Sequence, residues 1–90
     1  MIEHEICRAA LEKWGPQAQT AMVFEEMSEL QKELCKNLRG ANNRGHIAEE
    51  IADVTVMLEQ MILLHDCEQK VIDIRKQKLE RLRGRIEEVI

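Results

Sequence analysis

Hydrophobic residues recur every three or four positions along most of the chain, a period typical of amphipathic helices. The chain has one Pro and four Gly, so it carries few turn signals. A β-sandwich or barrel needs a turn about every 8–12 residues, and this sequence does not fit one. We therefore predict four helices, spanning Ile2–Lys13, Gln17–Leu38, His46 to His65 or Asp66, and Cys67 to the region of Val89.

The breaks between these helices have clear local signals. Trp14 and Gly15 end the first helix. Pro16 suits the first turn of the next helix, because a residue there needs no backbone N–H donor. Between the second and third helices, Gly40–Gly45 is the only convincing loop. A connection this short predicts that the two helices pack antiparallel.

The third helix is apolar on nearly all sides between Ile51 and Leu64. Such a helix is stable when most of its surface is buried. The rest of a 90-residue chain hardly suffices to cover it. We therefore predict an all-α, four-helix, bundle-like fold that forms a single domain over residues 1–90. Homo-oligomerisation, into a dimer or a tetramer, would complete the bundle.

Charge and cysteine content narrow the class of protein. The formal net charge of −4 disfavours binding to nucleic acid. No apolar run approaches the roughly 18 residues of a membrane span, and the acidic start does not resemble a secretory signal, so we expect a cytoplasmic protein. Residues 1–66 carry 12 acids and 6 bases, whereas residues 67–90 carry 5 acids and 7 bases. Cys7, Cys35 and Cys67 show no CxxC spacing and predict reduced thiols that fill space between helices.

Two pairs of carboxylates lie on or beside the apolar faces of the second and third predicted helices. At 100° per residue, Glu26 and Glu50 each lie within such a face, with Glu29 and Asp53 about 60° away from them. A buried carboxylate is costly unless it is paired or bound to a metal. Adjacent helices lie about 8–10 Å apart, so the four groups can converge on one site for Mg²⁺ or Mn²⁺. Alternatively, each pair faces solvent, or Glu26 and Glu50 pair with bases of the fourth helix.

The acidic residues also carry a family resemblance. Glu25–Glu29 reads EEMSE, Glu50–Asp53 reads EIAD, and 20 residues separate them. This pattern resembles the EExxE…ExxD signature of the MazG-like all-α nucleoside triphosphate pyrophosphohydrolases. The flanking sequence is similar to the family as well. It includes WG followed by Gln19, and the stretches FEEMSEL, AEEIADVTVML and KLERLRGRI. The similarity covers residues 13–86.

The resemblance implies an activity and a site. Members of this family hydrolyse nucleoside triphosphates between the α and β phosphates, need Mg²⁺, and form helical bundles that dimerise, some of them into tetramers. The expected substrate is a dNTP or a non-standard NTP. Glu25 and Glu49 would support the metal ligands or act on the attacking water. The family's metal ligands correspond to Glu26, Glu29, Glu50 and Asp53.

Basic and aromatic side chains would bind the rest of the nucleotide. The candidate phosphate-binding bases are Lys32, Lys36, Arg75, Lys78 and Arg81, with Lys36 and Lys78 preferred; each is alternatively a solvated surface residue. Trp14 either stacks on the base at the mouth of the site or covers the small core. Met57 stands where some pyrimidine-preferring relatives have an aromatic residue, which argues against a tight pyrimidine pocket. Asn42 and Asn43 either contact the nucleotide or serve the turn.

Two other functions are compatible with the sequence. One is the phosphoribosyl-ATP pyrophosphohydrolase of histidine biosynthesis, which is similar in length and fold, although the flanks resemble the MazG-like group better. The other is a non-catalytic helical adaptor or regulatory subunit. The presence of all four predicted metal ligands argues against this second function. The three histidines have no Ser or Cys partner at a recognisable spacing, and the chain lacks a GKS or GKT phosphate loop.

Overall fold

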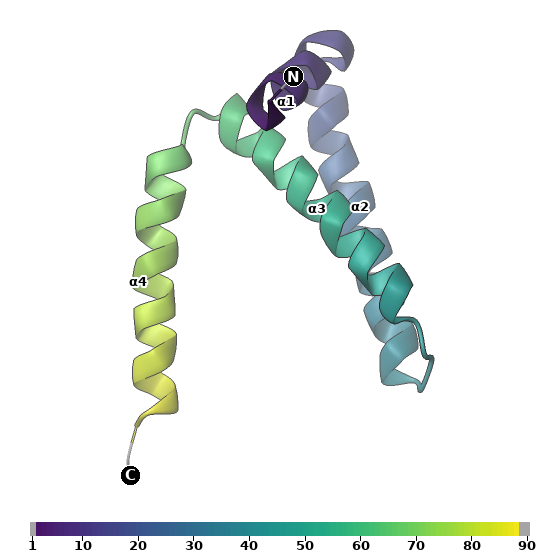
Figure 1. Ribbon diagram of the computed structural model, residues 1–90, viewed down its shortest axis with the longest axis vertical. Coiled ribbons are helices and arrows are strands. Elements are labelled where there is room, and N and C mark those ends of the chain that lie inside the picture. The colour runs from purple at the N-terminus through teal and green to yellow at the C-terminus, as the bar shows by residue number, and fades with distance from the viewer. Residues whose placement is uncertain (1, 89–90) are drawn as a thin grey trace.

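The computed structural model describes residues 2–88, and it consists of helices joined by short connections (Figure 1). No strand occurs among these residues, which confirms the all-α class. Seven of the eight predicted helix boundaries agree with the observed ones to within two residues. The fourth helix ends at Ile86, before the predicted region of Val89, which itself lies outside the described residues. The helices are α1 (Glu3–Trp14), α2 (Pro16–Leu38), α3 (Arg44–Leu64) and α4 (Glu68–Ile86).

The α2–α3 hairpin is the centre of the fold. The two helices lie side by side and run antiparallel, as the short connection predicts (Figure 1). α1 packs across α3 and α2 near the end of the hairpin distant from that connection. The hydrophobic core is small, because the buried apolar side chains in the described part of the chain are Cys7, Val23, Val54 and Met57.

The connection between α2 and α3 is shorter than predicted. Arg44 and Gly45, which we expected in the loop, form the first turn of α3. The reason is the buried Asn43 side chain, whose Nδ2 donates to the backbone oxygen of Glu33 at 2.9 Å and to its Oε1 at 3.0 Å. Asn43 is thereby fixed to α2, and the next helix begins directly after it. Of the two alternatives for Asn43, the structure shows the role in the turn.

α4 stands apart from the other helices. It meets only the end of α3 and then diverges from the hairpin, so every residue of α4 is exposed (Figure 1). The radius of gyration is 16.4 Å, compared with about 12 Å for a compact chain of this length. α1, α2 and α3 thus pack as a small unit, and α4 does not complete a bundle within one chain.

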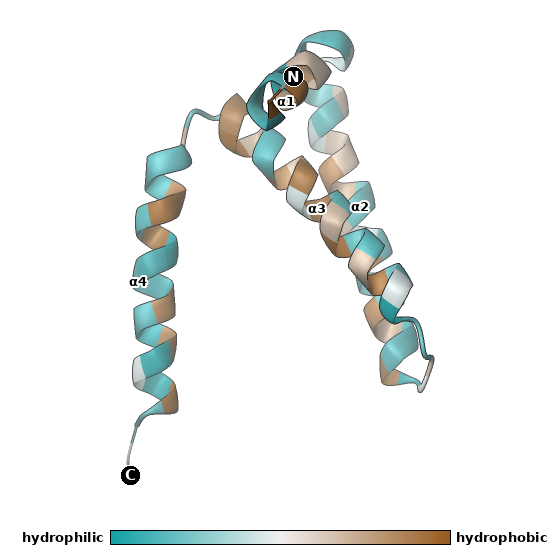
Figure 2. Cartoon of the chain, in the orientation of Figure 1, coloured by the Kyte–Doolittle hydropathy of each residue, from teal (hydrophilic) through white to brown (hydrophobic). Residues whose placement is uncertain are grey.

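Much apolar surface remains uncovered. Ile51, Val56 and Leu58 of α3 are 40–51% exposed, and hydrophobic positions recur along the whole of α4 (Figure 2). The prediction that one chain cannot cover α3 is confirmed to this extent. The three cysteines are free, but Cys35 is exposed on α2, so its description as a space-filling residue was wrong. Within residues 2–88, no helix has both the length and the apolar character needed to cross a bilayer.

Candidate carboxylate site

The α2–α3 hairpin brings three predicted carboxylates together. One carboxylate oxygen each from Glu26, Glu29 and Glu50 lies within 4.8 Å of the other two. Glu26 and Glu29 are one turn apart on α2, and the antiparallel packing of α3 places Glu50 opposite them. The convergence expected from the i, i+3 spacing and the short connection is therefore present for these three groups.

Asp53 lies at the edge of this cluster. Its carboxylate oxygens are not among those that lie within 4.8 Å of one another, and Asp53 is exposed. Its negative charge nevertheless contributes to raising the pKa of both Glu26 and Glu50. Asp53 is thus close enough to act on the cluster electrostatically.

Two oxygens of the cluster are buried without a partner. They are Oε2 of Glu26 and Oε2 of Glu50, neither of which accepts a hydrogen bond within the described residues. A buried carboxylate oxygen in this state loses its hydration without compensation. The ion pairs in the described part of the chain involve other acids, so the alternative that a fourth-helix base of the same chain neutralises Glu26 or Glu50 is not realised.

The environment of the cluster favours protonated carboxyls. Desolvation is the first cause that raises the pKa of Glu26, followed by the negative charges of Glu29 and Asp53. Desolvation is also the first cause for Glu50, again followed by the charges of Glu29 and Asp53 and by a hydrogen bond to the Glu29 carboxyl. A bound cation would reverse this balance, because it would favour the ionised form of each group.

Glu25 and Glu49 flank the cluster and point toward solvent. Both residues are exposed, and Oε2 of Glu49 lies 3.7 Å from Nδ1 of His46. Glu25 contributes to the raised pKa of Glu26, and Glu49 contributes to that of Glu50. Glu26 and Glu50, each with one buried oxygen, therefore each have an exposed carboxylate beside them.

An apolar pocket lies about one helical turn from the carboxylates. Its volume is 380 Å³, and Met22 and Met57 connect it to the cluster, since each is four residues from a predicted metal ligand. Trp14 also lines this pocket and is 59% exposed. Gln19 also lines the pocket and is 7% exposed. We did not predict Gln19 as a site residue, although its spacing of seven from Glu26 places both on one helix face.

The predicted phosphate-binding bases are not gathered at the cluster. Lys36 Nζ pairs with Glu33 Oε2 at 3.1 Å, and Lys32 is exposed one turn from Glu29. Arg75, Lys78 and Arg81 lie on α4, the helix that diverges from the hairpin (Figure 1). Within residues 2–88, the structure thus assembles an acidic cluster and an adjoining apolar pocket, and none of these bases forms an ion pair with Glu26, Glu29 or Glu50.

Comparison of the chain with protein-family models, curated proteins and solved structures finds no match. The MazG-like resemblance therefore depends on the residues of the signature and its flanks. The geometry of the hairpin is an independent observation, because it does not rely on that resemblance.

Proposed function

We propose that this chain is a Mg²⁺-dependent nucleoside triphosphate pyrophosphohydrolase of the MazG-like type. The observation that carries the proposal is the cluster of Glu26, Glu29 and Glu50, with its two buried, unpartnered oxygens. The same residues belong to the EExxE…ExxD pattern of the sequence. Two independent features, side-chain geometry and motif spacing, thus single out the same carboxylates.

The donor set fits a hard divalent cation. It consists of carboxylate oxygens, and the nitrogen and sulfur ligands typical of zinc or copper sites are absent from it. Glu26, Glu29 and Glu50 would hold Mg²⁺ or Mn²⁺ together with Asp53. When bound, the cation would neutralise part of the charge on the carboxylates and the phosphates and lower the pKa of a bound water.

The remaining side chains of the hairpin suit a nucleotide. Glu25 or Glu49 would accept the proton of the water that attacks the α phosphorus, since both are accessible beside the cluster. Trp14 offers an exposed aromatic ring for stacking on a base, and the pocket behind it is lined by Met22 and Met57. The α phosphate would then lie between the base pocket and the acidic cluster.

The product pattern tests this proposal. Purified protein with Mg²⁺ is incubated with a panel of NTPs and dNTPs, including non-standard bases, and the products are followed by ³¹P NMR. We expect a nucleoside monophosphate and pyrophosphate from at least one nucleotide, and we expect Glu50→Gln to remove this activity. Folded wild-type protein that hydrolyses none of them, or that releases orthophosphate and a diphosphate, would overturn the assignment.

A non-catalytic helical adaptor is the second candidate function. The uncovered surface of α4 favours it, since adaptors expose helical faces to partners. In that case Glu50→Gln would change neither the binding of the biological partner nor the oligomeric state. The wild-type protein would hydrolyse no nucleotide. The same ³¹P NMR panel therefore separates the two functions.

A further inference from the structure

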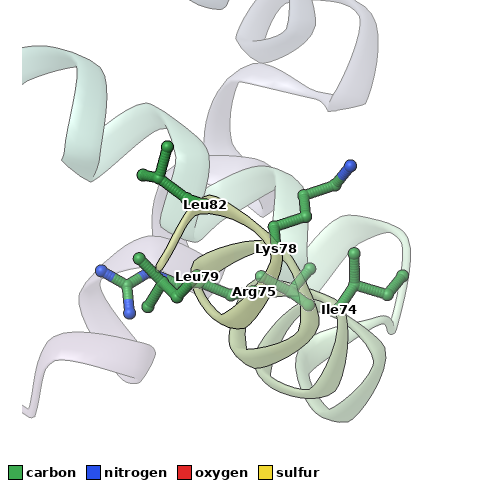
Figure 3. A pocket seen from close by; sticks show the side chains of 6 residues that line it. Ile74, Arg75, Lys78, Leu79 and Leu82 are labelled. Atoms are coloured by element: carbon green, nitrogen blue, oxygen red, sulfur yellow. The ribbon is translucent and has the colours of Figure 1, made fainter. Parts of the chain in front are cut away.

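The pocket beside the carboxylates lies where three helices meet. Its lining residues are Trp14 from the end of α1, Ala18, Gln19 and Met22 from α2, and Met57 from α3. The hollow on α4, by contrast, is lined by side chains of that one helix, so it is an uncovered helix face (Figure 3). Sites for small molecules are concave and mostly apolar, with a few polar groups that orient the ligand. The three-helix pocket has this composition, with Gln19 as its polar member.

The Gln19 side chain is buried, and its amide has no partner in the described part of the chain. Gln19 is 7% exposed, and no hydrogen bond among residues 2–88 involves its amide nitrogen or amide oxygen. A glutamine amide both donates and accepts hydrogen bonds, and leaving it buried and unpaired costs free energy. A purely apolar ligand would not relieve this cost. An occupant that satisfies Gln19 therefore presents a donor and an acceptor side by side.

A second amide without a strong partner adjoins the pocket. Gln60 is 5% exposed, and its Oε1 is buried without a hydrogen-bond partner within residues 2–88. Its Nε2 lies 3.9 Å from Sδ of Met57, which lines the pocket. Thr20 Oγ1 donates to Met61 Sδ at 3.6 Å. This contact joins the chain neighbours of Gln19 and Gln60, so the two amides lie at the same level of the hairpin and favour a polar occupant there over an apolar one.

The distance from Gln19 to the carboxylates suits a nucleotide. Gln19 precedes Glu26 by seven residues on α2, which corresponds to about 10 Å along the helix axis. The base edge and the α phosphate of a nucleotide are separated by a comparable length. Trp14 offers an exposed ring on which a base can stack, and Met57 offers an apolar contact. A planar base can thus fill the pocket while its phosphate reaches the acidic cluster.

We propose that Gln19 recognises the nucleobase through a pair of hydrogen bonds to adjacent groups on the base edge. A lactam edge offers a ring N–H beside a carbonyl oxygen, and an amidine edge offers an amino group beside a ring nitrogen. The Gln19 amide would donate through Nε2 and accept through Oε1, and it matches either edge by turning over. The inference rests on the proposed function in taking a nucleotide as the ligand, but recognition of the base needs no hydrolysis.

The fluorescence of Trp14, the single tryptophan of the chain, reports on the pocket without an assay of activity. Wild-type protein with Mg²⁺ is titrated with α,β-methylene nucleoside triphosphates, which cannot be cleaved between the α and β phosphates. The panel contains each common base and, for the base that binds most tightly, an analogue whose ring lacks the exocyclic group. We expect quenching, with the complete base bound about tenfold or more tightly than its analogue. No binding of any nucleotide, or equal affinities for base and analogue, would overturn the proposal.

Gln19→Met separates base recognition from packing, because it keeps the length of the side chain and removes both polar atoms. We expect the preference for the complete base over its analogue to fall below about threefold in this variant. The matched control is Gln17→Met, at an exposed position of α2, which should keep the wild-type preference. An unchanged preference in Gln19→Met would refute the inference alone. Wild-type protein that shows the preference but hydrolyses no nucleoside triphosphate would refute only the proposed function.

Discussion

At the scale of single residues, the site is an arrangement of like charges that the apoprotein tolerates poorly. Glu26 and Glu50 each bury one oxygen without a partner, and Glu29 and Asp53 add negative charge beside them. The crowding is relieved by protons or by a cation. It therefore makes the stability of the protein depend on pH and on divalent ions, in directions that can be worked out.

Removing one charge should stabilise the metal-free protein. Glu50→Gln keeps the shape of the side chain and abolishes its repulsion with Glu29 and Asp53. We expect the Tm in EDTA at pH 7.5 to rise by roughly 2–5 °C, measured by circular dichroism. Glu12→Gln, at an exposed position of α1, is the control and should shift the Tm little. A lower Tm for Glu50→Gln would mean that the carboxylates do not repel one another.

The pH dependence follows from the raised pKa of Glu26 and Glu50. Both groups bind protons more tightly in the folded chain than at their ordinary pKa of 4.5. Their stabilising effect is fully present below pH 4.5 and is lost as the pH rises through the folded pKa. The Tm difference between a Glu26→Gln/Glu50→Gln variant and the wild type in EDTA should therefore grow over this interval. A difference that stays constant would refute the crowding.

Glu33 should show the opposite trend. Hydrogen bonds from Asn43 and Lys36 lower its pKa in the folded chain. Its contribution to stability is present above the unfolded pKa and disappears as the pH falls through the folded value. The cluster and Glu33 thus act in opposite directions: as the pH rises from the acid range, Glu26 and Glu50 lose stability while Glu33 gains it.

At the scale of elements, the α2–α3 connection depends on one buried amide. Asn43 donates to both the backbone and the side chain of Glu33 and accepts from Asn37 Nδ2 at 3.3 Å. We expect Asn43→Ala to cost about 1–3 kcal/mol, because the part-buried backbone and carboxylate oxygens of Glu33 lose their donor. Urea unfolding measures this change, with the exposed Asn42→Ala as the matched control. Equal effects of the two substitutions would contradict the role of Asn43.

The sequence predicted the elements better than their assembly. Helix boundaries follow from local signals such as Gly15 and Pro16, and the convergence of Glu26 with Glu50 follows from i, i+3 spacing and a short connection. The role of Asn43 was less predictable, since it depends on a backbone oxygen ten residues earlier in the chain. The place of α4 at one end of α3 was not predicted, because the apolar spacing of a helix does not specify which surface covers it.

At the scale of the whole molecule, the chain is more extended than its length requires. Its longest dimension is 52 Å, and its accessible surface exceeds that of a compact monomer of this mass by about 2,100 Å². Folding and association are expected to be coupled, since the core within residues 2–88 has four buried apolar side chains and is small for an independent domain.

Coupled folding and association predict a Tm that depends on concentration. Raising the protein concentration a hundredfold should raise the Tm, as measured by scanning fluorimetry. Leu82→Asp, on the apolar face of α4, should remove this dependence and give a particle of 10.5 kDa in light scattering. Gln77→Asp introduces the same charge on the opposite side of α4 and should change neither result. A concentration-independent Tm for the wild type would contradict the coupling.

The most direct test of the carboxylate site is the binding of Mn²⁺, followed by the loss of the free-ion EPR signal. We expect the wild type to bind Mn²⁺ in competition with Mg²⁺. Glu50→Gln should weaken binding about tenfold or more, while Glu12→Gln should bind like the wild type. Wild-type protein that leaves Mn²⁺ free, or a Glu50→Gln protein that binds it equally well, would contradict the account.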